Sequence, residues 1–176
     1  MTSTGRAATV SVSDNGEAQI HFWNPSNGIL VEEIALVARV DTEHIQSAFI
    51  HGQEVYTVES VGSGVKVQSY DLKTGKEAKS VINYADVHNC QHTESMFVCL
   101  SSDNRKVHYT SLPLELISDM KYSPLENIPV SGIIETFSNV DNADAVKLGY
   151  THGETSKVLV IKFAEGQITD VKTYER

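Results

Sequence analysis

Side chains that bind metals or form disulfides cluster in the segment "HNCQHTESMFVC". His88, Cys90 and His92 occupy alternate positions, which puts them on one face of an unbroken strand, and Cys99 follows in the next strand. Imidazole nitrogen and thiolate sulfur are the ligands of structural zinc, so a four-ligand site across a hairpin is one interpretation. Three ligands from one strand nevertheless differ from the paired knuckles of ordinary zinc sites. We therefore predict no metal ion here.

The spacing of the two cysteines also fits a cross-strand disulfide. If "NCQH" pairs with "MFVCL" around a short turn between Thr93 and Met96, Cys90 falls opposite Cys99. Directly opposed residues satisfy the Cα separation of about 4.4 to 6.8 Å that a disulfide requires. We predict a Cys90–Cys99 bridge in an oxidising compartment. Two buried free thiols are the alternative.

Other side chains of catalytic type are explained by turns. "HGQE" at His51 and "HGET" at His152 look like a repeated acid–base pair, but they lie at different distances from the repeated glycines described below. Glycine beside polar residues is ordinary turn chemistry. Ser63 in "GSG" lacks the strand-to-helix elbow of a hydrolase nucleophile, so we interpret it as a hairpin turn. We predict no catalytic residue.

Composition limits the classes of partner. The 176 residues carry a net charge of -9 with a pI near 5.2, so the cationic stripe that nucleic-acid binding requires is absent. No apolar run approaches the ~18 residues of a membrane span. The first residues lack the apolar segment of a signal peptide, so we expect either a cytosolic protein or a chain that starts downstream of its true N-terminus. A solvated acidic face is expected at Glu32, Glu33, Asp41 and Glu43.

The hydrophobic pattern predicts an all-β fold. Thirteen short strand candidates alternate with turn sequences such as "SDNG", "PSNG", "GSG" and "KTG". One stretch, "ILVEEIALVARV", has helix-like spacing, but it follows Gly28 as "KEAKSVI" follows Gly75, so we interpret both as strands. This many short strands indicates a sandwich, a barrel or a propeller.

A repeated turn favours the propeller. "WNPSNG" and "YDLKTG" each set an aromatic residue ahead of a polar turn that ends in glycine, at Gly28 and Gly75, and "FAEG" restates the turn at Gly166. Glycine at that place adopts a positive φ that other residues resist. Repeats of roughly 40 to 50 residues with four strands each are typical of propeller blades. We predict one β-propeller segment of about four blades, incomplete, with blades near residues 8–36, 46–83, 89–121 and 132–176, the third lacking the signature turn.

A family resemblance follows from the same residues. "WNPSNGILVEEIAL", "SGVKVQSYDLKTGKEAKSVIN" and "CQHTESMFVCLSSDNRKVHYTSLPLE" resemble, in this order, the N-terminal luminal region of subunit 1 of the endoplasmic reticulum membrane protein complex. The likeness covers about Trp23 to Val140. It implies a quinoprotein-like β-propeller on the luminal side of a large subunit that a transmembrane helix anchors near its C-terminus. The complex inserts tail-anchored and multipass proteins. Lacking a signal peptide, a transmembrane helix and most of that length, the chain would be a fragment of such a subunit.

The expected function is therefore a non-enzymatic luminal scaffold whose partners are the other subunits of that complex. A quinone cofactor would need tryptophan and metal-binding residues in a central channel, and Trp23 is the sole tryptophan, so we predict no cofactor. A cytosolic propeller scaffold of the WD-repeat type is the alternative, although no Trp-Asp strand end occurs. A cofactor-binding quinoprotein is the third possibility.

Overall fold

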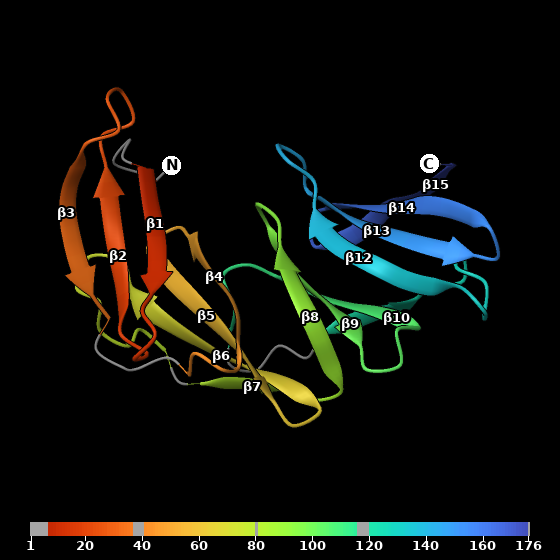
Figure 1. Cartoon of the computed structure of the whole chain (residues 1–176), viewed down its shortest axis with the longest axis horizontal. Coiled ribbons are helices and arrows are strands. Elements are labelled where there is room, and N and C mark those ends of the chain that lie inside the picture. The colour runs from red at the N-terminus through yellow and green to blue at the C-terminus, as the bar shows by residue number, and fades with distance from the viewer. Residues whose placement is uncertain (1–6, 37–40, 80, 116–119, 176) are drawn as a thin grey trace. The chain divides into compact units, whose positions relative to one another are not determined.

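The computed structural model describes residues 7–36, 41–79, 81–115 and 120–175. Across these residues the fold is all-β, with fifteen strands, no helix, and therefore no helix long and apolar enough to cross a membrane. The strands form four antiparallel sheets in sequence order (Figure 1). The chain divides into two compact units, with the boundary between Ala85 and Asp86. The sequence pattern, by contrast, predicted a single propeller segment.

The first unit contains two sheets. The first sheet has three strands, β1 (Ala7–Val12), β2 (Ala18–Trp23) and β3 (Leu30–Ala35). The second has four, β4 (Ile45–His51), β5 (Glu54–Val61), β6 (Gly64–Asp71) and β7 (Ile82–Tyr84). Of the segment with helix-like spacing, Leu30–Ala35 is a strand, while residues 37–40 lie outside the described part.

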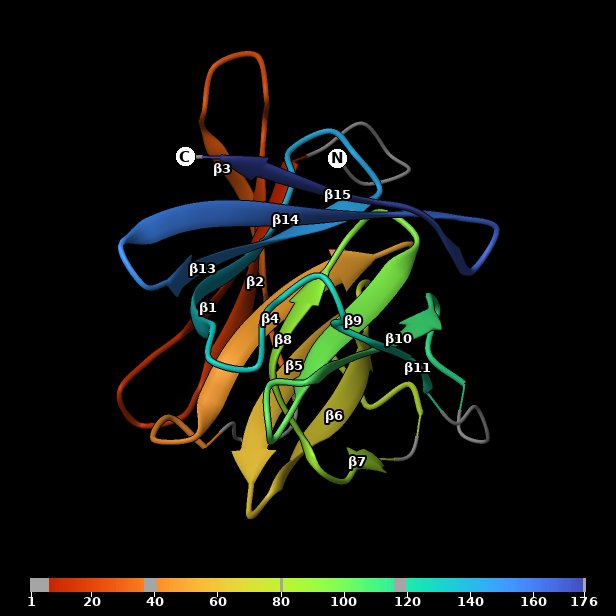
Figure 2. The same ribbon diagram turned by 90° about the vertical axis from the view of Figure 1, so that its right-hand side faces the viewer.

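The second unit contains the other two sheets. The third sheet comprises β8 (Val87–His92), β9 (Met96–Ser101), β10 (Lys106–Ser111) and β11 (Lys121–Pro124). The fourth comprises β12 (Ile133–Asn139), β13 (Ala145–His152), β14 (Thr155–Ala164) and β15 (Gln167–Glu175). Figure 2 shows β13, β14 and β15 side by side.

Two strands exceed the thirteen that the pattern predicted. β8 has the polar sequence "VHNCQH" and β11 has only four residues, so neither carries the apolar alternation on which strand prediction depends. Of the two, β8 was expected only through the pairing of its cysteine with Cys99. The predicted strand "KEAKSVIN" is shorter than expected: apart from one bridge between Tyr70 and Glu77, pairing with β6 is limited to Ile82–Tyr84.

The two sheets of the first unit pack against each other. In β2 the residues Ala18, Ile20 and Phe22 are buried while their neighbours are not, which is the period-2 pattern of a sheet with one covered face. They share a cluster with Val55 and Tyr70 of the second sheet. Burial of this layer is what holds the three-stranded sheet in place, because such a small sheet is marginal alone.

The second unit has a larger core between its two sheets. Val98 and Leu100 of the third sheet pack in one cluster with Leu148, Leu159 and neighbouring residues of the fourth. A polar contact adds to it. The Asp144 carboxylate, ahead of β13, accepts hydrogen bonds from the hydroxyls of Thr93 and Ser95 in the turn between β8 and β9. The third and fourth sheets are therefore joined by an apolar layer and by charge-assisted hydrogen bonds to Asp144.

The repeated glycines lie in equivalent turns, between the last two strands of the first, second and fourth sheets. Their φ angles are +67° at Gly28, +69° at Gly75 and +72° at Gly166. In the second turn the Asp71 carboxylate accepts hydrogen bonds from Lys73 N and Thr74 N at 3.0 and 2.8 Å, and its bond with the Thr74 side chain lowers its pKa. The polar residues of the signature therefore close the turn, and glycine supplies its left-handed residue.

Two of these glycines differ in their surroundings. A Cβ atom on Gly28 would meet nothing within 4 Å, whereas one on Gly75 would lie 2.2 Å from the carbonyl oxygen of Ala35. The second turn thus rests directly on the end of β3, and only glycine permits that approach.

We predict that Gly75→Val lowers the free energy of unfolding by clearly more than Gly28→Val. Both variants carry the cost of positive φ, about 1 to 3 kcal/mol. Gly75→Val must also displace the Ala35 backbone. Thermal and denaturant unfolding of the two variants beside the parent will measure the difference, and equal losses would contradict the contact with β3.

Among the described residues the first sheet has three strands where the other sheets have four. The signature turn aligns β2 and β3 with the last two strands of the second and fourth sheets, so the position without a described strand is beside the outer edge of β1. Ser13 N donates to Glu17 O at 2.9 Å, so Ser13 and Glu17 form a hydrogen-bonded pair. Hydrogen-bonded and non-hydrogen-bonded pairs alternate along an antiparallel ladder, and the N–H groups of Ala8, Val10 and Val12 therefore point away from β2. Within the described residues β1 pairs with β2 alone.

We therefore expect the chain to self-associate through this edge, because unpaired strand edges pair with one another. Val10→Pro removes an outward N–H without breaking the ladder and should lower the mass measured by light scattering at high concentration. Ser11→Pro is the matched control, since its N–H faces β2 and its loss should lower stability instead. A monomeric parent at every concentration would contradict this prediction.

Candidate functional site

The two cysteines lie opposite each other in the third sheet. The register pairs Cys90 with Cys99, Gln91 with Val98 and His92 with Phe97. Thr93 N donates to Met96 O at 2.8 Å, so alternation makes the Cys90–Cys99 pair a non-hydrogen-bonded one, where Cα atoms approach most closely. The Cα atoms are 4.1 Å apart, slightly nearer than the range expected from sequence, and a disulfide joins the two residues.

A bulge separates the histidines that the zinc interpretation grouped together. Asn89 has a φ of +46°, and the register shifts so that His88 faces Leu100 while Cys90 faces Cys99. Neighbouring residues of β9 point to opposite faces, so His88 lies on the face opposite Cys90. The expectation that the three alternating residues share one face is therefore wrong. No group of three or more His, Cys, Asp and Glu that could hold a metal occurs in the described ranges.

The remaining candidates from sequence lie in hairpins or on exposed strands. His51 precedes Gly52 in the turn between β4 and β5, and His152 precedes Gly153 in the turn between β13 and β14, so the two occupy different turns of their sheets. Ser63 lies in the tight turn between β5 and β6. Exposed side chains at the surface of the first unit include those of Glu32, Glu33, Asp41 and Glu43.

A row of side chains crosses the disulfide face of the third sheet. His108 lies opposite Cys99, and Tyr122 lies opposite His108. The His108 and Tyr122 rings are 5.8 Å apart, and Lys106 Nζ lies 5.0 Å from the Tyr122 ring centroid. Burial lowers the pKa of His108, and the positive charge of Lys106 lowers it further. The imidazole is thereby held neutral beside the disulfide at neutral pH.

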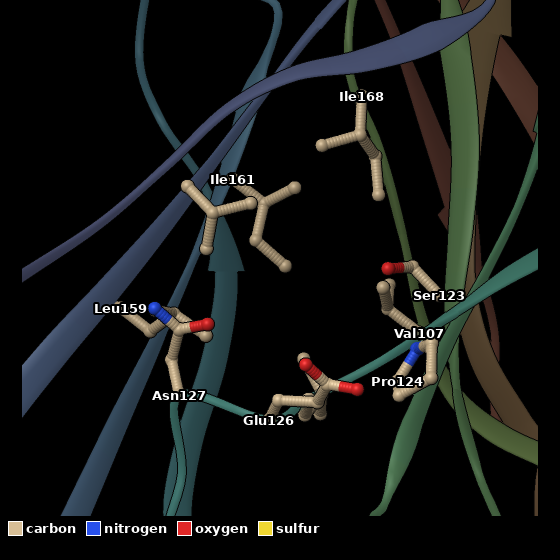
Figure 3. Close-up of a pocket in the computed structure, with 10 residues that line it drawn as sticks. Val107, Ser123, Pro124, Glu126, Asn127, Leu159, Ile161 and Ile168 are labelled. Carbon is tan, nitrogen blue, oxygen red and sulfur yellow. The ribbon is translucent and has the colours of Figure 1, made fainter.

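The second unit also contains a pocket, which the sequence analysis did not foresee. It measures about 340 Å³ and opens between the outer strands of the third and fourth sheets. In Figure 3 the side chains of Ile161 and Ile168 lie across the opening from Val107, Ser123 and Pro124. Its other lining residues are Leu125, Glu126, Asn127, Leu159 and Val171.

The pocket combines an apolar floor with a polar rim. Leu159 and Ile161 form a buried apolar floor, whereas Glu126 and Asn127 at the rim are exposed. The volume lies at the lower end of the range for ligand pockets. An apolar group fits the floor, and a cationic or amide donor fits the Glu126 carboxylate.

Comparison with known proteins identifies the fold and no family. No protein-family model and no curated protein matches the chain. Solved structures that resemble it include Hsv2 from Kluyveromyces lactis, with 8% identity, coverage of 96% of this chain and 59% of that one, and a TM-score of 0.53. A structure from a study of two prolyl endopeptidases has 14% identity, covers 93% and 27%, and has a TM-score of 0.54.

A third similar structure is a putative 6-phosphogluconolactonase from Bacteroides fragilis, with 11% identity, coverage of 99% and 55%, and a TM-score of 0.50. The chain thus spans between 27% and 59% of the length of these three proteins. At such identities the likeness concerns the fold alone.

We predict that removing the disulfide in Cys90→Ala/Cys99→Ala lowers the free energy of unfolding by about 2 to 3 kcal/mol, as the closure of a short loop allows. Unfolding should be measured with and without reductant. Reductant should lower the stability of the parent and leave that of the double variant unchanged. Equal stability of parent and double variant would contradict a stabilising bridge.

Proposed function

We propose that the chain is a segment of a β-propeller in which each sheet is one blade. Four consecutive antiparallel sheets, three of them with four strands, support this architecture. So does the signature turn, which recurs before the last strand of three sheets. The solved structures of Hsv2, a β-propeller protein, are similar to nearly the whole chain.

The function we propose is that of a scaffold in the endoplasmic reticulum lumen, within a complex that inserts membrane proteins, and this role needs no catalytic step. The observation that carries the proposal is the cysteine hairpin of the third sheet. It lies inside the segment that resembles subunit 1 of the endoplasmic reticulum membrane protein complex, and it holds a disulfide. Disulfides persist in the lumen and are rare in the cytosol, so this hairpin favours the luminal scaffold over the cytosolic one.

The pocket of the second unit is the contact that we assign to this role. Scaffold propellers act by binding other chains, and an apolar pocket rimmed by a carboxylate accepts an apolar side chain with a neighbouring cation. Val171 lines the pocket and is 37% exposed, so it is accessible to a partner.

The test compares the chain carrying an added secretory signal with the same chain lacking it. After cross-linking in cells, the luminal form should be joined to other subunits of the insertion complex and the cytosolic form should not. Val171→Glu should weaken the cross-link by placing a charge in the apolar pocket. Tyr174→Glu is the matched control, because Tyr174 is exposed on the same strand and does not line the pocket.

Two outcomes contradict the proposal. Cross-links of the luminal form that never include a subunit of the complex would remove the assigned function. Equal cross-linking of Val171→Glu and the parent would leave the scaffold role intact and remove the pocket as its contact.

A further inference from the structure

The outward face of the first sheet carries side chains capable of chemistry. Because residues alternate along β2, Ala18, Ile20 and Phe22 point into the core while His21 and Trp23 point outward. The register places Thr9 of β1 and Glu33 of β3 on either side of His21. The three strands therefore bring polar side chains together around one imidazole.

His21 contacts a hydroxyl and a carboxylate through its two ring nitrogens. The Ser11 Oγ atom lies 2.7 Å from His21 Nε2, and Glu33 Oε1 lies 3.0 Å from His21 Nδ1. An ionised carboxylate only accepts hydrogen bonds, so Nδ1 carries the proton and donates it to Glu33. Nε2 is then left with its lone pair and accepts the hydrogen bond of the Ser11 hydroxyl.

The surrounding residues hold this imidazole in place. The His21 and Trp23 rings are stacked, with centroids 6.1 Å apart, and Trp23 Nε1 donates to Thr9 Oγ1 at 2.9 Å. The His21 side chain is 17% exposed, and Ser11 is exposed. The base is thus shielded and oriented, while the hydroxyl that it contacts is open to solvent.

This connectivity is that of a serine nucleophile, its general base and an orienting carboxylate. We propose that Ser11, His21 and Glu33 form an acyl-transfer site for small activated esters. The site lies on the outward face of the first sheet, and the proposal is independent of the scaffold function. It departs from the expectation, drawn from the sequence, that the chain has no catalytic residue.

The step is balanced as follows. Ser11 Oγ bonds to the ester carbonyl carbon while its proton moves to His21 Nε2, and the bond from that carbon to the leaving oxygen breaks as His21 returns the proton to it. Water then attacks the acyl carbon with His21 again as base, and the bond to Ser11 Oγ breaks. One ester and one water become one carboxylic acid and one alcohol or phenol.

The sheet limits which esters react. Strand N–H groups lie in the plane of the sheet, so the backbone aims no donor at an oxyanion above Ser11. Gln19 lies directly opposite Ser11 on the same face, and its carboxamide is the donor that the register supplies. With this single flexible donor, only esters with good leaving groups are expected to acylate Ser11.

Apolar residues beside the site favour aromatic leaving groups. Trp23 is paired with Leu30, which is 39% exposed, and the adjacent Val31 is 53% exposed. An aryl ring can rest on these side chains while its ester carbonyl lies at Ser11. We therefore assign small aryl esters as the substrate class.

The test uses 4-nitrophenyl acetate with the whole chain, with acetylated residues located by peptide mass spectrometry over time. Ser13 is the internal control, because the hydrogen-bond acceptors beside its hydroxyl are Asn15 Oδ1 and Glu17 O and not an imidazole. Ser11 should be acetylated about 100-fold faster than Ser13, the size of a general-base contribution. Equal rates at the two serines would overturn the proposal.

Variants then separate the roles of the base and the carboxylate. His21→Gln should lower the Ser11 rate to that of Ser13, and Glu33→Gln should remove most of the roughly 100-fold advantage of Ser11, since the amide removes the charge and no longer fixes the tautomer of His21. His44→Gln is the matched control, because His44 Nδ1 lies 2.8 Å from Asp41 in an exposed turn of the same unit.

The His44→Gln variant should react as the parent does. Unchanged acetylation of Ser11 in Glu33→Gln and His21→Gln would overturn the proposal. Should His21→Gln fail to fold, the comparison of Ser11 with Ser13 in the parent and in Glu33→Gln still decides it.

Discussion

The structure depends on each sheet covering one face of its neighbour within the same unit. Ile20 of the first sheet and Val55 of the second are fully buried in one apolar cluster. Leu148 and Leu159 of the fourth sheet are fully buried in a second cluster, which they share with residues of the third sheet. A sheet of three or four short strands is marginal when isolated, so this apolar layer supplies the stability that the strands lack. In the first sheet the opposite face stays partly exposed, whereas β9 of the third sheet is buried on both faces.

The turn glycines couple the sheets as well as the strands. Gly75 combines a positive φ with an approach to the Ala35 carbonyl that no side chain allows, so the turn of the second sheet packs on the last strand of the first. Gly28 has the same φ and open surroundings. The repeated glycine thus supplies the left-handed residue of the turn at both Gly28 and Gly75, but only Gly75 also permits close packing against another sheet.

The candidate functional features differ in their relation to the core. The Ser11–His21–Glu33 group occupies the outward face of the first sheet, whereas the disulfide of the third sheet is itself buried, with Cys90 and Cys99 3% and 0% exposed. The pocket opens where the outer strands of the third and fourth sheets diverge over Leu159 and Ile161. A scaffold built this way can bind through one region and carry separate chemistry on another.

Local sequence was sufficient for the strands, the turns and the pairing around Thr93, because period-2 alternation, glycine and short hairpins are determined by neighbouring residues. The hydrophobic pattern did not mark β8 or β11, and β8 was expected only because its cysteine had to lie opposite Cys99. The bulge at Asn89, which separates His88 from Cys90, also has no signal in residue spacing. Ser11, His21 and Glu33 could have been related only by assuming the register of three strands, and the pocket required the packing of two sheets. Sequence thus determined which elements form, and tertiary structure decided which faces meet, because burial joins residues that are distant along the chain.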